Sequence, residues 1–456
     1  MARIPVEKSL VKFSLPPEFS YVKTDDPEFN QALDLILNTS YNLFINGPAG
    51  VGKSVLIELS YKLLPGATMI VGSTGISASH LADDGIPATT IHCGLRIKPQ
   101  DIYSRKYNSK DKNERKGRDI LTGVDTLLIE EVGMVSASLF DQIGKLVEKA
   151  QEKTKKPIRI ICFGDVLQLA PVVKKEGVVK DYYEKVYDEK IFFFNSFFYK
   201  THKFVPVFLN KIYRQAEGSF QNVLNRLRLD KPTSSDFATV NSRIISLEEF
   251  KEERPISLIL APTNSTVRYL NDTYGIPDES AEKFQYQAVA AGEFNWENAG
   301  LVEKNITIYK GQQVMCIHNE TGSFQNGTLG IAVDVSKDSV SVQKSNGVIV
   351  TVKKHKWAQY DYYFNYHTGE VEAKEIGSVV QIGCKPATAS TIHKAQGLTL
   401  ESVYFDLRDR WVPASGIYLG LSRCKTLEGI GISRKIVPAD IEVEEEPLDF
   451  LRRYLA

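Results

Sequence analysis

The sequence predicts an α/β protein with two parallel-sheet domains, and three features of the chain point to this fold. Short apolar runs rich in β-branched residues alternate with helical patterns as far as residue 170, as expected of strands buried on both faces. A second series of such runs begins at residue 204. Between residues 275 and 386 strand patterns alternate with turns, which predicts a small antiparallel β module inserted into the second domain.

The first domain is expected to span residues 1–201. Its strands should be the apolar runs 42–46, 67–71, 126–129 and 158–163. Between the last two runs, residues 138–150 place their apolar side chains on one stripe at helical spacing, which predicts an amphipathic helix. Strands and helices that alternate in this way form a parallel sheet covered on both faces.

The second domain is expected to span residues 202–456. Its strands should be 204–209, 257–261, 402–406 and 429–432, with the β module at about 275–386. Within the module, Asn326-Gly327 and Asn346-Gly347 lie between apolar runs, a pattern typical of hairpin turns. We expect the aromatic run 192–199 to pack in a core rather than to bind a ligand.

The composition is that of a globular protein, with 43% hydrophobic and 25% charged residues, which excludes disorder or a coiled coil for the whole chain. No apolar run approaches the ~18 residues of a membrane span, and the N-terminus shows no secretory signal. We therefore expect no membrane contact and a cytoplasmic location. The 5 cysteines lack metal-ligand spacing and should be free thiols.

Charge is balanced overall, since Lys and Arg total 56 and Asp and Glu also total 56. The segment 98–118 departs from this balance, because its eight basic residues exceed its three acidic residues by five. Tyr103 and Tyr107 lie among them. A nucleic-acid-binding surface needs a local basic excess of this kind, and a solvated loop is the alternative.

The most specific motif runs from Gly47 to Ser54 and fits the pattern G-x-x-x-x-G-K-[ST] in full, between an expected strand and an expected helix. In such a loop the backbone N–H groups and the helix N-terminus surround a phosphate chain. The lysine then reaches the β- and γ-phosphates, and the final hydroxyl binds Mg²⁺. The expected nucleotide-binding residues are Gly47, Pro48, Ala49, Gly50, Val51, Gly52, Lys53 and Ser54.

Two carboxylates, Glu130 and Glu131, follow the apolar run 126–129. A Mg²⁺-ATP site needs one acid to hold the metal and a second to orient and deprotonate the attacking water. Solvated charges at a strand end are the alternative. Gln168 follows the next run, at the edge where parallel sheets place their ligands, and could contact the γ-phosphate.

These motifs resemble, in order and over nearly all of the chain, those of the Pif-type DNA helicases of superfamily one, with RecD-like enzymes as relatives. Residues 130–134 stand where the family has D-E-I-S-M, so that Glu130 replaces Asp and Gly133 replaces Ser. The other segments that resemble family motifs are 72–76, 89–92, 139–141, 211–215, 261–264, 391–399 and 418–423.

The resemblance implies two RecA-like P-loop domains that bind ATP and Mg²⁺ between them, with a basic wedge-like insertion at about 96–118 in the first and a β-barrel-like insertion in the second. The implied catalytic residues are Lys53, Glu130, Glu131, Gln168, Arg214 and Arg423. Gln31, or Asn30 beside it, and Gly397 complete the nucleotide site, and Ser54 and Glu130 hold the metal. The implied DNA-binding residues are Thr74, Gly75, Thr90, His92, Pro262, Asn264, His393 and Lys394.

The implied activity is ATP-driven movement 5′ to 3′ along single-stranded DNA, with unwinding of forks, by a monomer. Guanine quadruplexes and RNA–DNA hybrids are further candidate substrates. Such helicases work in DNA repair, replication and telomere maintenance. The replacement of Asp by Glu130 motivates an alternative, a nucleotide-regulated DNA-binding or remodelling factor with weak hydrolysis. A P-loop phosphotransferase would not need the motifs of the second domain.

Overall fold

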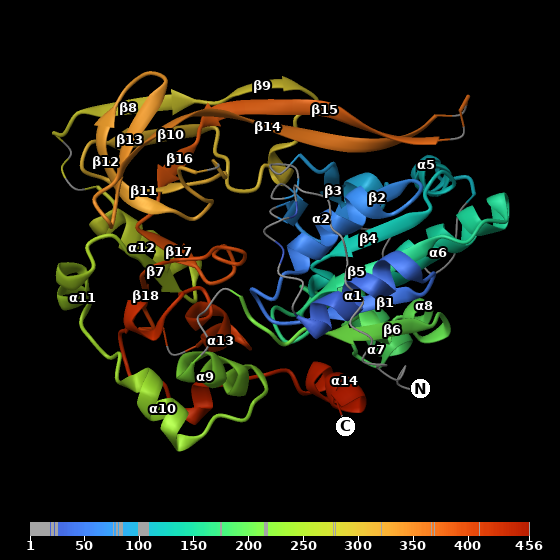
Figure 1. Ribbon diagram of the computed structural model, residues 1–456, viewed down its shortest axis with the longest axis horizontal. Coiled ribbons are helices and arrows are strands. Elements are labelled where there is room, and N and C mark those ends of the chain that lie inside the picture. Colours follow the sequence, from blue (N-terminus) through green and yellow to red (C-terminus); the bar gives the residue numbers. More distant parts are fainter. Residues whose placement is uncertain are drawn as a thin grey trace. The chain divides into compact units, whose positions relative to one another are not determined.

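The computed structural model describes residues 19, 22, 26–75, 77–78, 81, 85–98, 109–173, 176–213, 218–276, 278, 280–320, 322–365, 367–368, 370–409 and 411–455. They divide into two compact units, drawn in Figure 1. Unit 1 comprises Met1–Tyr213, Gln359–Ile376 and Asp449–Ala456, and unit 2 comprises Arg214–Ala358 and Gly377–Leu448.

Unit 1 is built on a parallel sheet of six strands in the order β3-β2-β4-β5-β1-β6. The four strands expected for the first domain are present to within one residue at each end. The strands are β1 (Asn42–Asn46), β2 (Thr68–Gly72), β3 (Ala88–Thr90), β4 (Thr126–Glu130), β5 (Arg159–Gly164) and β6 (Phe204–Phe208).

Helices cover both faces of this sheet, as predicted. On one face Leu43 and Ile45 pack in a core with α1 and α2. On the other face Phe44 meets Phe193, with ring centroids 5.2 Å apart, and Phe193 meets Phe140 of α6. The helices are α1 (Pro27–Asn38), α2 (Lys53–Leu63), α4 (Ile91–Gly94), α5 (Lys112–Leu121), α6 (Ala137–Thr154), α7 (Gly177–Tyr187) and α8 (Phe197–Thr201).

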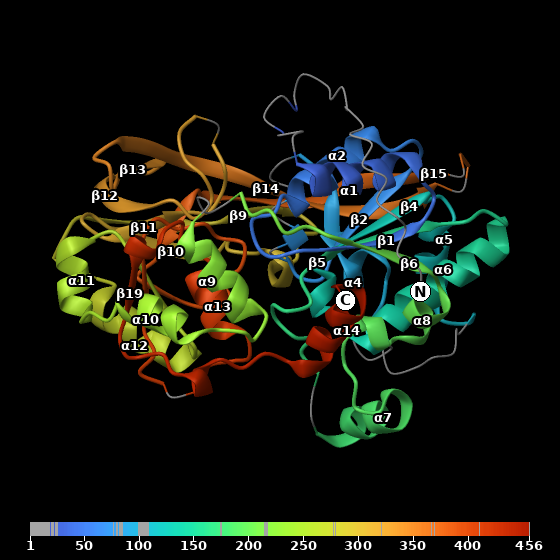
Figure 2. The same cartoon turned by 60° about the horizontal axis from the view of Figure 1, so that its bottom comes forward.

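The aromatic run 192–199 is core, as expected, except for Phe197, which is 38% exposed. The predicted amphipathic helix 138–150 is α6, which begins after the N-cap Ser136 and continues to Thr154. Figure 2 shows α7 standing away from the sheet, and it is held near α6 by Tyr183 and Tyr187, which pack with Ala137.

The strand expected at 204–209 belongs to unit 1 and not to the second domain, which corrects the predicted boundary at residue 201. This strand, β6, pairs in parallel with β1 from Asn42 to Asn46. The segment that follows it also stays with unit 1, because Glu28 accepts hydrogen bonds from the backbone and side-chain nitrogens of Asn210 at 2.6 and 2.9 Å.

The β module predicted at 275–386 is not wholly part of the second unit, because Gln359–Ile376 belongs to unit 1. Within unit 1 the Arg96 guanidinium binds both carboxylate oxygens of Asp361, at 2.8 and 2.7 Å. The Tyr362 hydroxyl donates to the Pro87 carbonyl at 2.6 Å and accepts from the Ile70 amide at 3.2 Å. These polar contacts fix the segment on the described part of unit 1.

Unit 2 contains a four-stranded parallel sheet in the order β17-β7-β18-β19. Its strands are β7 (Leu258–Ala261), β17 (Ala389–Thr391), β18 (Val403–Phe405) and β19 (Ile430–Ile432). The helices of the second half are α9 (Ser219–Arg228), α10 (Ser234–Asn241), α11 (Leu247–Glu253), α12 (Asn264–Tyr274), α13 (Gly416–Leu421) and α14 (Glu445–Leu455), whose last residues belong to unit 1.

The inserted module forms a seven-stranded sheet in the order β16-β11-β12-β13-β14-β15-β9, with β8 and β10 as a separate pair. The predicted turns are present, since Asn326-Gly327 lies between β11 and β12 and Asn346-Gly347 lies between β13 and β14. The strands are β8 (Lys283–Gln287), β9 (Val289–Gly292), β10 (Asn305–Tyr309), β11 (Gln313–Cys316), β12 (Leu329–Val335), β13 (Ser339–Lys344), β14 (Ile349–Asn365), β15 (Glu370–Ile382) and β16 (Cys384–Pro386).

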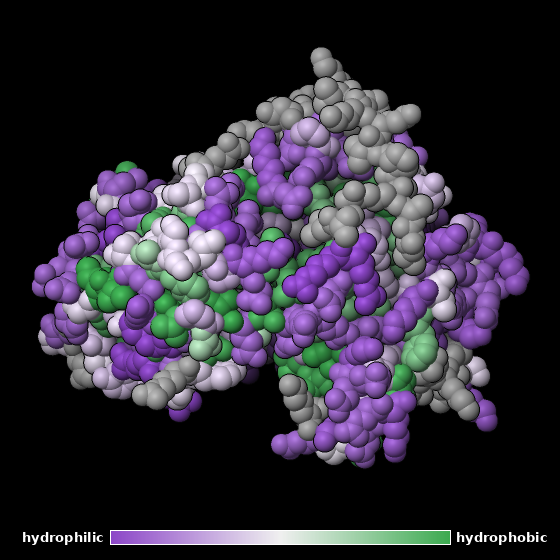
Figure 3. Space-filling view, turned by 90° about the horizontal axis from the view of Figure 1, so that it is seen from below, coloured by the Kyte–Doolittle hydropathy of each residue, from purple (hydrophilic) through white to green (hydrophobic). Residues whose placement is uncertain are grey.

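The surface of unit 1 carries many hydrophilic residues, which predominate on the right of the face shown in Figure 3. Within the described ranges, no helix is both long and apolar enough to cross a membrane. All five cysteines are free thiols, as expected, although Cys316 and Cys384 lie opposite each other on β11 and β16.

Candidate nucleotide and DNA sites

The loop from Gly47 to Ser54 connects β1 to α2, in the strand–loop–helix context that its pattern predicted. Gly50 and Gly52 have φ values of 83° and 88°, which side chains other than glycine rarely adopt. The Lys53 ammonium donates to the carbonyls of Gly47 and Pro48 at 2.8 and 2.9 Å, so the lysine lies along the inside of the loop. Ser54 is exposed at the first turn of the helix.

The strand order brings the other candidate catalytic residues to this loop. Strands β4, β5 and β1 are neighbours and run parallel, so the segments after their carboxyl ends meet at one edge of the sheet. Glu130 ends β4, Glu131 follows it, and Gln168 lies in the turn after β5. Lys53 lies close enough to Glu130 to interact with it electrostatically.

Glu130 is half-buried, and one oxygen of its carboxylate is a candidate ligand for a cation. Its Oε2 atom is buried and accepts no hydrogen bond within the described part of the chain. Burial, and then the charge of Glu131, raises the pKa of Glu130 to about 8, while the charge of Lys53 acts in the opposite direction. A divalent cation beside this oxygen would restore the ionised form, so the residue fits a metal-binding role.

This raised pKa predicts how stability depends on pH. Glu130 binds its proton more tightly in the folded chain, so its favourable contribution is present below about pH 4.5 and is lost as pH rises through about 8. Glu130→Gln, which cannot ionise, should therefore raise the apparent melting temperature of the nucleotide-free protein, and the gain should increase from pH 5 to pH 9. Glu152→Gln, at a side chain that is 60% exposed, is the matched control. A gain independent of pH would contradict the assignment.

Gln168 is held in place by Asp165, a residue that sequence reasoning did not single out. The Asp165 carboxylate is buried and accepts from the Gln168 side-chain amide at 3.1 Å and from the Leu167 amide at 3.1 Å. The same turn is bound to β1, because the Val166 amide donates to the Asn46 side chain at 3.3 Å. The turn after β5 is thus anchored on both sides.

Tyr213 is a second residue that the sequence interpretation missed, although it lies inside the motif 211–215. Its amide donates to the Gly50 carbonyl at 2.7 Å, and its hydroxyl donates to Asp26, the N-cap of α1, at 2.6 Å. A Cβ added to Gly52 would lie 3.2 Å from the Phe29 ring and 3.9 Å from that of Tyr213. An aromatic residue directly before an arginine in this motif was the signal that could have found it.

Other residues expected at the nucleotide site lie on α1 and beyond residue 213. Gln31 is half-exposed on α1, whereas its neighbour Asn30 is 6% exposed. Arg214 lies outside the described residues. Arg423 is described and is 1% exposed; its Nε donates to the Leu419 carbonyl at 3.1 Å and its Nη2 to the Ser422 hydroxyl at 3.0 Å.

The expected DNA-binding residues of unit 1 follow β2 and β3. Thr74 and Gly75 lie just beyond β2, and Thr74 exchanges hydrogen bonds with Ser77. Thr90 is the N-cap of α4 and accepts from the Cys93 amide at 3.4 Å. His92 contacts the Ile97 carbonyl through Nδ1 at 2.9 Å. The Thr90 and His92 side chains therefore have structural partners of their own.

In unit 2 the expected DNA-binding residues lie after β7 and β17. Asn264 is exposed at the start of α12, two residues after the buried Pro262. His393 and Lys394 are exposed in the turn that follows β17, and Gly397, with φ 86°, is exposed in the same turn.

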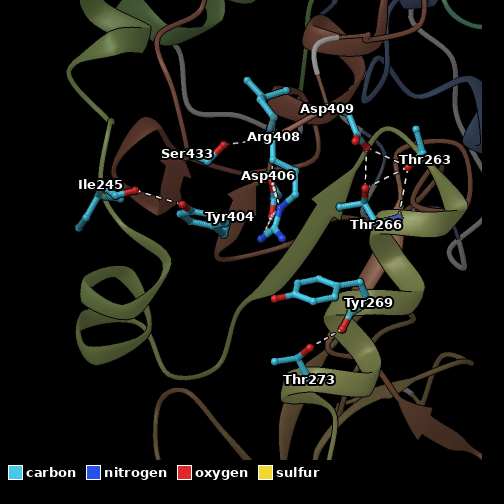
Figure 4. Close-up of polar contacts among 11 residues, drawn as sticks. Ile245, Thr263, Thr266, Tyr269, Thr273, Tyr404, Asp406, Arg408, Asp409 and Ser433 are labelled. Carbon is cyan, nitrogen blue, oxygen red and sulfur yellow. Dashed lines mark hydrogen bonds and ion pairs between the residues drawn. The ribbon is translucent and has the colours of Figure 1, made fainter.

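The start of α12 is fixed by a polar cluster, shown in Figure 4. The hydroxyls of Thr263 and Thr266 donate to one oxygen of Asp409 at 2.8 and 2.6 Å. Beside them the Arg408 guanidinium is paired with the buried Asp406 and lies 5.0 Å from the centre of the Tyr269 ring. These contacts hold Asn264 in a defined position on the surface of unit 2.

The basic segment 98–118 is described only at its ends, because residues 99–108, with Tyr103 and Tyr107, lie outside the described residues. Its second half forms α5, on which Lys112, Arg115 and Lys116 are exposed. Arg118 is instead paired with Asp119 at 2.5 Å. The exposed positive charge of the helix is therefore smaller than the number of its basic residues indicates.

The segment 139–141, at the start of α6, has a structural role. Both carboxylate oxygens of Asp141 are used: one accepts from the Phe198 amide at 2.8 Å and the other from the Tyr187 hydroxyl at 2.7 Å. Asp141 thereby joins α6 to α7 and α8.

Comparison with known proteins places these motifs in context. The family model for PIF1-like helicases matches residues 26–226. An ATP-dependent DNA helicase Pif1 from Campylobacter jejuni is 26% identical over 408 residues, which cover 84% of this chain and 86% of that protein. The crystal structure of a Bacteroides Pif1 in complex with ADP-AlF4 superposes with a TM-score of 0.80 and 28% identity, covering 94% of this chain and 96% of that one. A Bacteroides Pif1 bound to single-stranded DNA has a TM-score of 0.60 at 28% identity and the same coverage.

Proposed function

Since the chain is a helicase of the Pif1 type, we propose that it hydrolyses ATP and uses the energy to move 5′ to 3′ along single-stranded DNA and to open duplex DNA. The observation that carries this proposal is the edge of the unit 1 sheet. At this edge the phosphate-binding loop follows β1, the turn with Gln168 follows β5, and the two carboxylates lie at the end of β4. A Bacteroides relative of similar fold has been crystallised with single-stranded DNA bound.

In this site the position of each residue determines its proposed role. The loop 47–54 surrounds the phosphate chain, and Lys53 exchanges its loop carbonyls for the β- and γ-phosphates. Glu131 orients and deprotonates the attacking water, and Gln168, held by Asp165, contacts the γ-phosphate. The Tyr213 ring, 37% exposed beside the loop, offers a stacking surface to the base.

Mg²⁺ fits the residues present. The buried Oε2 of Glu130 accepts no hydrogen bond within the described chain, and the exposed hydroxyl of Ser54 lies at the start of α2. These two residues would hold the ion, which supplies positive charge to phosphate oxygens when bound. The longer side chain of Glu, compared with Asp, keeps the carboxylate charge at the metal position.

In this proposal unit 2 contributes residues that bind the nucleotide and residues that bind DNA. Arg214 and Arg423 approach the γ-phosphate, and Gly397 lines the nucleotide site. Asn264, His393 and Lys394 are exposed after parallel strands of unit 2, where they can contact a DNA strand. The remaining residues proposed to contact the DNA strand are Thr74, Gly75, Thr90 and His92 of unit 1 and Pro262 of unit 2.

We further propose that the chain acts as a monomer and that its substrates include guanine quadruplexes or RNA–DNA hybrids.

The decisive experiment combines two measurements on the purified chain. ATP turnover should rise on addition of single-stranded DNA, and strand displacement should occur on a duplex with a 5′ tail but not on one with a 3′ tail. The alternative, a nucleotide-regulated DNA-binding factor, predicts DNA binding without DNA-stimulated turnover. Unwinding assays on guanine-quadruplex and RNA–DNA hybrid substrates test the further substrates. Light scattering tests whether the chain is a monomer.

The exposed basic residues of α5 provide a prediction about DNA affinity. Arg115→Glu combined with Lys116→Glu should weaken binding to forked DNA and reduce the slope of log affinity against log salt by about 1 for each phosphate that is no longer neutralised. Fluorescence anisotropy between about 50 and 200 mM salt measures this slope. The matched control is Lys156→Glu with Lys200→Glu, at exposed positions of unit 1. An unaltered slope would mean that α5 is only a solvated surface.

A further inference from the structure

The turns that follow β4 and β5 touch through their backbones at Gly133. A Cβ added to Gly133 would lie 2.6 Å from the carbonyl oxygen of Asp165, closer than side-chain carbons approach an oxygen. Gly164 shows a milder constraint from the other side, since its Cβ would lie 3.0 Å from the Val132 amide nitrogen. Gly133 does not have the positive φ that would itself require glycine. Space, and not backbone conformation, therefore excludes a side chain there.

Each of the two turns carries a residue of the proposed hydrolytic site. Glu131 stands two residues before Gly133, with φ 53° and ψ 45°, a left-handed conformation that is uncommon for glutamate and must be held by its surroundings. Asp165 holds the Gln168 side chain through its carboxylate at 3.1 Å. The contact between Gly133 and Asp165 therefore links the turn that positions Glu131 to the residue that positions Gln168.

The phosphate-binding loop is bound to the same assembly. The Gly47 amide donates to the Gly164 carbonyl at 3.2 Å, and the Asn46 side chain accepts from the Val166 amide at 3.3 Å. The segments after β1, β5 and β4 are therefore linked in sequence by these hydrogen bonds and by the backbone contact at Gly133. A displacement of one segment is transmitted to the next, because there are no flexible side chains between Gly133 and Asp165 to absorb it.

We propose that Gly133 is a positioning residue, which couples the water-orienting Glu131 to the γ-phosphate contact Gln168 by allowing the Asp165 peptide to pack directly on the turn after β4. This proposal rests on the proposed function. A serine, which the family motif has at this position, would require the Asp165 peptide to move. At this position the chain therefore has a direct backbone contact between the two turns instead of a side chain.

The first test is Gly133→Ala and Gly133→Ser, measured as DNA-stimulated ATP turnover. Misplacement of a catalytic group by about 1 Å costs on the order of 10²-fold, so we expect kcat to fall by about 10-fold or more while the KM for ATP stays nearly unchanged. Gly218→Ala is the control, because a Cβ there meets no atom of the described residues within 4 Å. A normal kcat, or a change in KM alone, would overturn the proposal.

The second test separates coupling from general destabilisation. In a double-mutant cycle, Gly133→Ala should cost much less turnover in a Gln168→Ala background than in the unmodified chain, because the coupled partner is already absent. Additive losses would overturn the proposal. Asp165→Asn approaches the same link from the other side, since it keeps the shape but removes the carboxylate acceptor for the Gln168 amide, and it should lower kcat alone.

These outcomes distinguish the inference from the function beneath it. If the unmodified chain shows DNA-stimulated turnover and the Gly133 and Asp165 variants match it, only the inference fails. If the unmodified chain shows no such turnover, the proposed function fails and the inference fails with it. Thermal unfolding of each variant shows whether it is folded, and Asp165→Asn decides the case if neither Gly133 variant folds.

Discussion

Lys53→Ala should reduce DNA-stimulated ATP turnover by on the order of 10²–10³-fold or more and abolish strand displacement. The ammonium lies along the inside of the loop, 2.8 and 2.9 Å from two loop carbonyls, and we propose that it holds the β- and γ-phosphates. Binding of single-stranded DNA without nucleotide should survive, because the exposed residues assigned to DNA lie elsewhere. Turnover and anisotropy, measured on the same preparation, test both statements.

The control for this variant lies on the same helix. Lys62→Ala removes a lysine that is 39% exposed and paired with Glu58 one turn earlier, so it should leave turnover within the experimental error. Lys53→Ala could also loosen the loop, and the thermal shift caused by ADP reports whether the loop still binds nucleotide. Near-normal turnover in Lys53→Ala would show that the loop 47–54 is not the site of hydrolysis.

The phosphate-binding loop and the parallel sheet around it could be predicted because their determinants are local. Eight consecutive residues carry the loop, and its flanking strand and helix follow from apolar patterns in adjacent residues. Glu130 and Glu131 were found in the same way, as polar residues at the end of an apolar run. That Glu130 lies near Lys53 was implied only by the family resemblance, and the parallel sheet explains why the two meet.

The features that sequence reasoning missed depend on residues distant in the chain. The apolar run 204–209 was correctly predicted to be a strand, but nothing local shows that β6 pairs with β1. Asp361 binds Arg96 across 265 residues, so the outer part of the β14–β15 hairpin could not be assigned to unit 1 beforehand. The sequence analysis counted Arg118 among the basic residues of the segment 98–118, but the structure pairs it with Asp119.

Gly133 shows the same limit in a single residue. From the sequence, it was only a departure from the motif at a position where serine is usual. The reason for glycine there is the carbonyl oxygen of Asp165, which follows another strand, β5, and is adjacent only because β4 and β5 pair. A motif comparison detects such a substitution, and packing explains it.

Arg423→Lys should leave ATP affinity nearly intact and lower DNA-stimulated turnover sharply. A guanidinium is a planar fork of N–H donors, and Arg423 already directs Nε to the Leu419 carbonyl and Nη2 to the Ser422 hydroxyl, which fixes its plane. A lysine keeps the charge but cannot make both contacts while reaching a phosphate. Arginines that complete a phosphoryl-transfer site from another domain are typically worth on the order of 10³-fold or more in turnover.

Two comparisons make this prediction specific to the arginine as a catalytic group. Ser422→Ala removes the hydroxyl that accepts from Nη2 but leaves the guanidinium, so it should cost far less turnover than Arg423→Lys. Arg423→Ala should match or exceed the loss in Arg423→Lys, because the charge is gone as well. ATP affinity from equilibrium binding and turnover at saturating ATP must be measured separately in all three variants. If affinity falls while turnover at saturation is normal, Arg423 binds ground-state nucleotide or supports the fold, and the proposal that unit 2 completes the hydrolytic site is wrong.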